Sequence, residues 1–225
     1  LVLAEIDKAG VAHYHWYIEQ TTVPGLEADD ALKAGDPAPD ALHVGTLGLA
    51  MEPIADSLAA LVAAVPESTF VMVDPNCRPT ATPDFDRYQS RMRRVIERAD
   101  VVKGSDEDFE YLALAESPEA TARLLIEQGV GAVLVTQGGD DARGFCAGGE
   151  VSVPVPTVEV QDTVGAGDTF GGGFLAYWLE HGFGPRELGD VDLLEAAVTF
   201  AARAAAINCT RAGAEPPTRE EMGLD

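Results

Sequence analysis

Short apolar runs alternate with amphipathic segments along most of this chain, and this alternation is the feature that most restricts its fold. Short, mostly apolar runs occur at residues 41–45, 70–73, 101–102 and 132–136. Between them lie segments whose apolar residues recur at helical spacing, such as the one that Pro53 opens. Strands that are apolar on both faces are typical of parallel sheets with helical crossovers. The sequence therefore predicts an α/β fold of three layers, α-β-α, around a mostly parallel sheet.

Residues 1–22 precede this pattern and are expected to form a separate β lid on a core of residues 23–225. Apolar and polar residues alternate on both sides of residues 7–10, which predicts two strands joined by a turn. The apolar face of so small a sheet would need cover from a partner or substrate, and Val11, Tyr14 and Trp16 are its candidate residues. We therefore expect a homodimer formed through the lid.

The net charge excludes several classes of partner. Fifteen basic and 38 acidic residues give a formal charge of −23, which disfavours nucleic acid and anionic membrane surfaces. No apolar run approaches the roughly 18 residues of a membrane span, and we find no secretion leader. Cys77, Cys146 and Cys209 lack the spacing of a zinc site or a disulfide framework, which favours a reducing cytoplasm.

The segment at residues 162–170 carries the clearest chemical signal. Gly165, Ala166 and Gly167 precede a strongly amphipathic helix, so backbone N–H groups and the positive end of the helix dipole are open to a phosphate. Asp168 stands beside them, either as a helix cap or as a base. Phosphoryl transfer needs both electrostatic stabilisation of the transferred group and a base for the attacking hydroxyl, and this segment supplies both.

Residues 162–168 resemble the signature of the ribokinase-like (PfkB) carbohydrate kinases, a family that includes fructokinase, adenosine kinase and 2-keto-3-deoxygluconate kinase. The resemblance implies a ribokinase-like fold, ATP and Mg²⁺ as cofactors and a small sugar as substrate. It also implies that Gly165, Ala166, Gly167 and the Asp168 amide form an anion hole. The Asp168 carboxylate would then deprotonate the sugar hydroxyl.

Two further segments resemble parts of the family's site. Residues 74–78 resemble its Asp-Pro-Asn-x-Arg element, in which Asn76 and Arg78 would meet substrate or phosphate, although a polar turn is the alternative. Residues 103–108 fall where many members carry Asn-x-x-Glu, a pair linked to magnesium and phosphate placement. Lys103 is assigned to the nucleotide, and Asp108 would reach the metal through water unless the segment is only a helix start capped by Ser105.

The nucleotide site is expected to draw on two more segments. Thr136, Gly138 and Gly139 resemble the family's nucleotide turn, with a plain strand-ending turn as the alternative. Residues 208–214 resemble the segment that packs on adenine and closes a monovalent cation site, with Asn208 on the adenine side and Gly213 beside the nucleotide. The family's cation ligands include the carboxylate that matches Asp162, so the resemblance leaves K⁺ open.

Other readings of the chain are weaker. Neither the dinucleotide fingerprint Gly-x-Gly-x-x-Gly nor a Walker motif occurs. His13 and His15 could bind metal but lack a third ligand, and His43 and His181 are equally ordinary.

The substrate is less well defined than the reaction. Residues 45–53 and 74–78 most resemble the fructokinase-like branch, which favours fructose or a similar ketose. Kinases of 2-keto-3-deoxygluconate or of a nucleoside are the alternatives, as is a non-catalytic remnant that binds nucleotide. The family's opening Gly-Gly-x-x-x-Asn element does not occur, so we expect the N-terminal sugar-binding portion to be absent from these residues.

Overall fold

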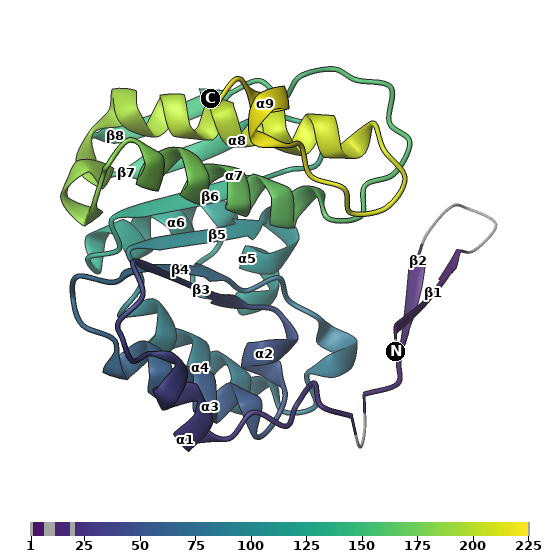
Figure 1. Cartoon of the computed structure of the whole chain (residues 1–225), viewed down its shortest axis with the longest axis vertical. Helices are drawn as coiled ribbons and strands as arrows, with labels where there is room; N and C mark the ends of the chain where they lie inside the picture. Colours follow the sequence, from purple (N-terminus) through teal and green to yellow (C-terminus); the bar gives the residue numbers. More distant parts are fainter. Residues whose placement is uncertain (1, 7–11, 19–20, 225) are drawn as a thin grey trace.

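A six-stranded sheet forms the centre of the molecule (Figure 1). The computed structural model describes residues 2–6, 12–18 and 21–224. The strands stand in the order β3-β4-β5-β6-β7-β8, with β3 to β6 parallel and the last two antiparallel. Their bounds are β3 Ala41–Gly45, β4 Phe70–Asp74, β5 Val101–Ser105, β6 Ala132–Thr136, β7 Ala142–Cys146 and β8 Gly149–Val153.

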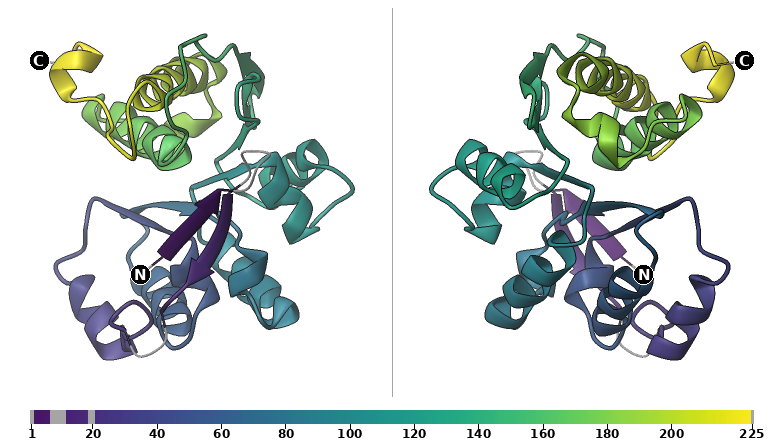
Figure 2. Two further views of the ribbon diagram at one scale, coloured as in Figure 1. Left: turned by 90° about the vertical axis from the view of Figure 1, so that its right-hand side faces the viewer. Right: turned by 90° about the vertical axis from the view of Figure 1, so that its left-hand side faces the viewer.

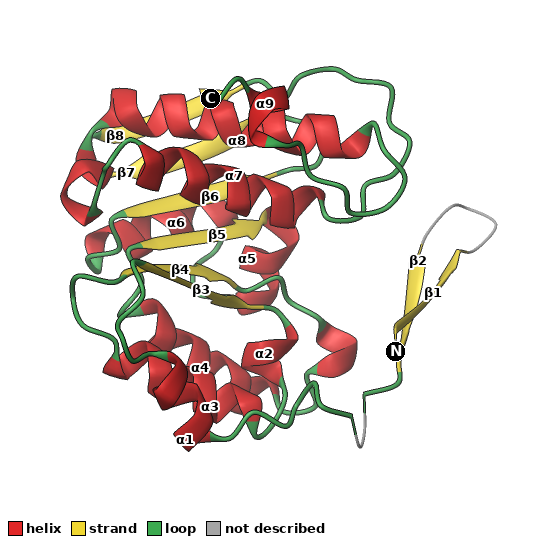
Figure 3. Ribbon diagram, in the orientation of Figure 1, coloured by secondary structure: helices red, strands yellow, loops and turns green. Residues whose placement is uncertain are grey.

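Helices cover both faces of this sheet (Figures 2 and 3), which confirms the predicted three-layer α/β fold. Alternate residues of β4 face opposite layers, because Val71 and Val73 join the core beneath α1 and α3 to α6, whereas Phe70 and Met72 join the core beneath α7 and α8. The helices are α1 Ala28–Ala34, α2 Leu47–Ala50, α3 Ile54–Ala64, α4 Phe85–Ile96, α5 Asp106–Leu112, α6 Pro118–Glu127, α7 Ala166–Glu180, α8 Val191–Cys209 and α9 Arg219–Met222, with 3₁₀ turns at Pro79–Ala81 and Pro185–Gly189.

Strands β1 Val2–Ile6 and β2 Ala12–Trp16 form a separate antiparallel sheet, drawn apart from the main body in Figure 1. The predicted pair of strands is therefore present, while its turn and Val11 lie outside the described residues. The division into a lid of residues 1–22 and a core of residues 23–225 stays a prediction. In the described part of the chain, no helix is both long and apolar enough to cross a membrane.

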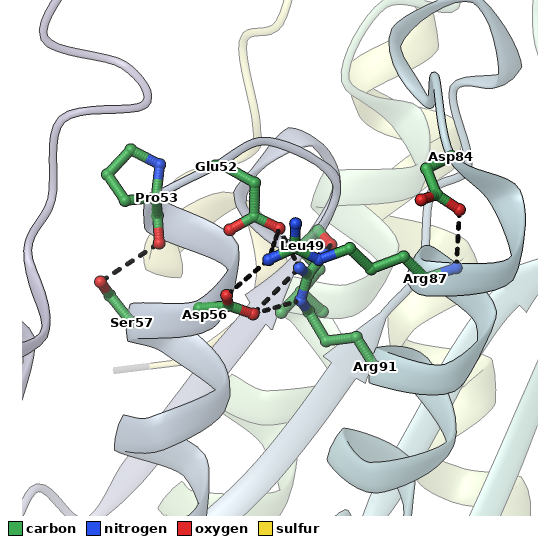
Figure 4. A network of polar contacts seen from close by, with 8 residues as sticks. All are labelled: Leu49, Glu52, Pro53, Asp56, Ser57, Asp84, Arg87 and Arg91. Carbon is green, nitrogen blue, oxygen red and sulfur yellow. Dashed lines mark hydrogen bonds and ion pairs between the residues drawn. The ribbon is translucent and has the colours of Figure 1, made fainter.

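A buried arginine ties α4 to the segment around α2 and α3 (Figure 4). The Arg91 guanidinium donates to the Leu49 carbonyl oxygen at 3.0 Å and to Asp56 Oδ1 at 3.0–3.1 Å, and it also pairs with Glu52. Arg87, one turn earlier, pairs with Asp56 from the exposed side at 2.8 Å. This network fixes the segment that follows β3 onto the body of the molecule.

Candidate active site

The loop that precedes α7 packs closely against Ala214, in the segment that follows α8. Gly165 is the N-cap of α7 and has a φ of 76°, and a Cβ at this position would lie 2.6 Å from the Ala214 Cβ. Glycine is required here both by conformation and by space. The Thr169 N–H donates to the Gly165 carbonyl oxygen at 2.8 Å, so the first turn of the helix begins at this point.

Asp162 braces this loop against the segment that follows α8. Its Oδ1 accepts from the Val164 N–H at 3.0 Å and its Oδ2 from the Gly213 N–H at 2.8 Å. These backbone donors lower the pKa of Asp162, because they stabilise the ionised carboxylate. The structure thus brings Asp162 and Gly213 together, as the predicted site requires, and shows both carboxylate oxygens engaged with backbone.

Asn208 lies behind the same loop, in a position that differs from the predicted adenine contact. The side chain is fully buried, and Nδ2 donates to the Val164 carbonyl oxygen at 2.9 Å. Its Oδ1 has no partner among the described residues and lies 3.8 Å from where a Cβ on Gly165 would stand. Asn208 is also not among the residues that line the cavity formed by the turn after β6, α7 and α8. The amide therefore supports the loop from within the protein.

Lys103 places a positive charge beneath the start of α7. Its ammonium lies 3.0 Å from the position of a Cβ on Gly167 and donates to Asp74 Oδ2 at 2.8 Å. Both side chains of this ion pair are about 95% buried or more. Burial raises the pKa of Asp74, and the neighbouring ammonium opposes that rise. Asp74 Oδ1 has no hydrogen-bond partner among the described residues.

The turn after β4 presents Asn76 and Arg78 at the carboxyl end of the sheet. Both residues are partly exposed, and Asn76 has a φ of 37°. The Arg78 guanidinium folds back onto the carbonyl oxygens of Asn76 and Cys77, at 3.2 and 2.8 Å. The turn is attached through Asp74 to Lys103, so the structure links these two residues to the start of α7.

Asp108 is the residue that holds this turn in place. Its Oδ1 accepts from the Cys77 N–H at 2.6 Å, and its Oδ2 accepts from both the N–H and the hydroxyl of Ser105 at 2.8 Å. The predicted Ser105 cap is present as a full capping box. Asp108 is buried, and among the described residues no group of three or more His, Cys, Asp or Glu side chains could hold a metal ion.

A cavity of about 370 Å³ opens beside the start of α7. Thr136, Gly138 and Gly139 line it from the turn after β6, and Ala166 and Gly167 line it from α7. The opposite walls come from residues 155–160 and from one face of α8, including Ala202, Ala205, Ala206 and Cys209. Its volume is in the range of small-molecule sites, and its walls are largely apolar apart from the glycine turns.

A second cavity, of about 400 Å³, lies on the other side of the loop, between α7, α8 and the C-terminal segment. Gly165 and the exposed Asp168 belong to its lining, as do several apolar side chains, namely Phe200, Pro216, Pro217, Met222 and Leu224. The predicted anion hole therefore separates two hollows, with Gly167 facing one and Asp168 the other.

Sequence reasoning did not single out Asp74 or His43 as site residues. The His43 ring lies 3.8 Å from the position of a Cβ on Gly171, in the second turn of α7. Partial loss of solvent lowers the pKa of His43, while the charges of Asp74 and Asp168 oppose this. Asp74 could have been found from its place directly after a buried strand, whereas a single histidine in an apolar run carries no such signal.

The family model described as pfkB family carbohydrate kinase matches residues 3–221 of this chain. The chain is 35% identical over 167 residues to a fructokinase of Rhizobium leguminosarum bv. trifolii, covering 74% of this chain and 51% of that protein. It is 30% identical over 184 residues to fructokinase-1 of Oryza sativa subsp. japonica, covering 80% and 56%. The chain thus spans about half the length of these two relatives.

Solved structures agree with this match. A fructokinase of Vibrio cholerae O395, in a form with bound fructose, ADP and calcium, aligns with a TM-score of 0.79 at 26% identity, over 95% of this chain and 68% of that one. A fructokinase of Xylella fastidiosa with bound ATP aligns with a TM-score of 0.84 at 25% identity, over 95% and 68%.

Proposed function

We propose that this chain, which belongs to the pfkB family of carbohydrate kinases, carries out ATP-dependent phosphorylation of a sugar hydroxyl group. Fructose or a similar ketose is the proposed substrate. The observation that carries this proposal is the start of α7, where exposed Asp168 lines one cavity, Gly167 lines the other, and the buried Lys103 ammonium lies next to Gly167.

The charges at this point suit phosphoryl transfer. The amides of residues 165–168 and the positive end of the α7 dipole would stabilise the negative charge that develops on the transferred group. The Lys103 ammonium adds a full positive charge that Asp74 already holds in place, so little reorganisation is needed when the reaction occurs. Asp168 would accept the proton of the attacking hydroxyl, which then displaces ADP from the γ-phosphoryl group.

The cavity beside Gly167 is the proposed nucleotide site. Thr136, Gly138 and Gly139 would contact ATP from the turn after β6, while Gly213 and Asn208 would hold the loop before α7 through Asp162 and Val164. Its glycine turns leave room for phosphates, and its apolar α8 wall suits a flat base. The Rhizobium and rice relatives are fructokinases, and the Xylella structure binds ATP, which supports this reading.

Mg²⁺ fits the described residues as a nucleotide-bound ion. Such ions are commonly held by phosphate oxygens, water and one or two carboxylates, so a dedicated cage is not required. Asp74, whose Oδ1 has no partner among the described residues, and Asp108, which holds the turn after β4, would bind the ion through its waters. The metal would neutralise phosphate charge during transfer. A K⁺ site at Asp162 stays a prediction.

The test of this function replaces Asp168 by asparagine in the intact protein. Asp168→Asn keeps the shape of the side chain but removes the base, so fructose-dependent ADP release should fall by about 10²–10⁴-fold. ATP affinity, measured by calorimetry, should stay similar or rise because a negative charge has left the phosphate site. Retention of more than about a tenth of wild-type turnover would contradict the base role. ATP binding without ADP release from wild type, with fructose, 2-keto-3-deoxygluconate or a nucleoside, would favour a non-catalytic nucleotide-binding protein.

A further inference from the structure

Thr46, the first residue after β3, has a backbone conformation that threonine rarely adopts. Its φ is 52° and its ψ is −139°, a combination unfavourable for a β-branched residue. Asn76, two residues beyond β4, also has a positive φ. The two side chains meet, because Asn76 Nδ2 donates to Thr46 Oγ1 at 3.2 Å. Two residues with positive φ, which follow neighbouring strands, are thus joined by one hydrogen bond.

The surroundings leave this geometry little freedom to relax. The Thr46 N–H donates to the Asp74 carbonyl oxygen at 3.1 Å. A Cβ on the preceding residue, Gly45, would lie only 1.8 Å from that same oxygen, so the ends of β3 and β4 are in direct contact. Asp108 fixes the far side of the Asn76 turn through the Cys77 N–H. Strain of this kind persists where neighbouring contacts impose it, and it concentrates at functional sites.

A glycine at position 46 would adopt the observed backbone angles without strain, so the threonine side chain calls for an explanation other than stability. Among the described residues, the Thr46 hydroxyl is the one hydrogen-bond partner of the Asn76 side chain. That bond orients the amide and leaves its carbonyl oxygen and second N–H without a protein partner. An amide that offers one donor and one acceptor matches the hydroxyl groups of a sugar.

We propose that Thr46 is a positioning residue for the phosphoryl acceptor, because its hydroxyl orients the Asn76 amide toward the sugar. This inference rests on the proposed kinase function and adds a specificity-determining residue to it. Thr46 lies directly after β3 and is tied to Asp74, the partner of Lys103, so the pair belongs to the same end of the sheet as the proposed anion hole. Loss of the hydroxyl should weaken acceptor binding and leave the nucleotide untouched.

Three substitutions in the intact protein separate the hydroxyl from the strain. Thr46→Ser keeps both, Thr46→Ala keeps the strain but not the hydroxyl, and Thr46→Gly removes both. We expect the KM for fructose to rise roughly 2- to 12-fold in the alanine and glycine variants, the range that one hydrogen bond supports, and to stay near wild type in the serine variant. The KM for ATP should not change. The melting temperature of Thr46→Gly should exceed that of Thr46→Ala by roughly 2–4 °C.

The outcomes distinguish this inference from the proposed function. If wild type phosphorylates fructose and Thr46→Ala shifts the KM for fructose by less than about twofold, below the range for one hydrogen bond, the positioning role is wrong and the kinase function stands. A serine variant that behaves like alanine, or an equal rise in the KM for ATP, would likewise overturn it. If wild type shows no sugar-dependent ADP release, both proposals fail together. A more stable glycine variant with a raised fructose KM supports strain retained for binding.

Discussion

A side chain at position 167, in the first turn of α7, would press against a buried charge. A Cβ there would lie 3.0 Å from the Lys103 ammonium, which cannot move away freely because it is buried and paired with Asp74. Gly172, further along the same helix, would place a Cβ with nothing within 4 Å. A side chain at position 167 would therefore meet a neighbouring charge, whereas a side chain at position 172 would meet no other residue.

Alanine at these two positions should give opposite results. Gly167→Ala should displace Lys103 and obstruct the approach to the amides, so the Kd for ATP measured by calorimetry should rise at least about tenfold, an effect of about 1.4 kcal/mol. Gly172→Ala is the matched control: it should stabilise the helix by about 0.5–1 kcal/mol and leave the Kd unchanged. Equal ATP affinity in both variants would place the phosphate elsewhere.

The place of a single residue in the site could be predicted only where the motif that indicates it is formed by neighbouring residues in the sequence. Gly165, Gly167 and Asp168 stand together, and their arrangement at a helix start is what the structure contains. The Lys103 to Asp74 pair joins residues 29 positions apart, so its geometry could not be read locally. The adenine role of Asn208 stays a prediction, because what the structure gives for its amide is a hydrogen bond to the Val164 carbonyl oxygen, which the sequence alone could not have indicated.

Helices α3 and α4 are joined by two arginines that share acidic partners but differ in burial. The Arg91 side chain is 2% exposed and also donates to the Leu49 carbonyl oxygen, whereas the Arg87 side chain is 55% exposed. A buried hydrogen-bonded charge leaves unpaired groups behind when it is removed. A solvated ion pair contributes little by comparison, because water replaces it. Only the inner arginine should determine how firmly the two helices pack.

Methionine at each position tests this difference. Arg91→Met should lower the free energy of unfolding by about 2–3 kcal/mol, since it removes charged hydrogen bonds to Asp56, Glu52 and the Leu49 carbonyl. Arg87→Met should lower it by about 0–1 kcal/mol. Urea denaturation at neutral pH measures both values. Similar losses in the two variants would show that burial does not decide the contribution of this network.

The pattern of apolar residues located the strands and helices that are long enough to show it, and it missed the shortest helices. The apolar runs at 41–45, 70–73 and 132–136 are strands as predicted, because buried parallel strands leave a continuous apolar signal. Strand β5 extends beyond the predicted 101–102 to Ser105, since Lys103 is buried there by pairing with Asp74 and not by hydrophobicity. Four-residue helices such as α2 and α9 are too short to produce a helical period.

At the scale of the whole molecule, the two-stranded sheet of β1 and β2 stands apart from the main body (Figure 1). Within the described residues, β1 pairs only with β2, and neither strand joins the six-stranded sheet. An isolated two-stranded sheet is marginally stable in water. The predicted homodimer would solve this problem, because a second copy could cover one face of the pair of strands.

The dimer is tested by light scattering of the intact protein at micromolar concentration, where we expect twice the mass of one chain. Residues alternate between the two faces of a strand, so Tyr14 and Trp16 should share the covered face, and His13 and His15 should share the other. Trp16→Glu should therefore shift the protein to monomer, because an unpaired carboxylate would be buried in the contact. His15→Glu, the matched control one residue away, should leave the dimer intact. A monomeric wild type would refute the dimer, and equal effects of the two substitutions would move the contact to another surface.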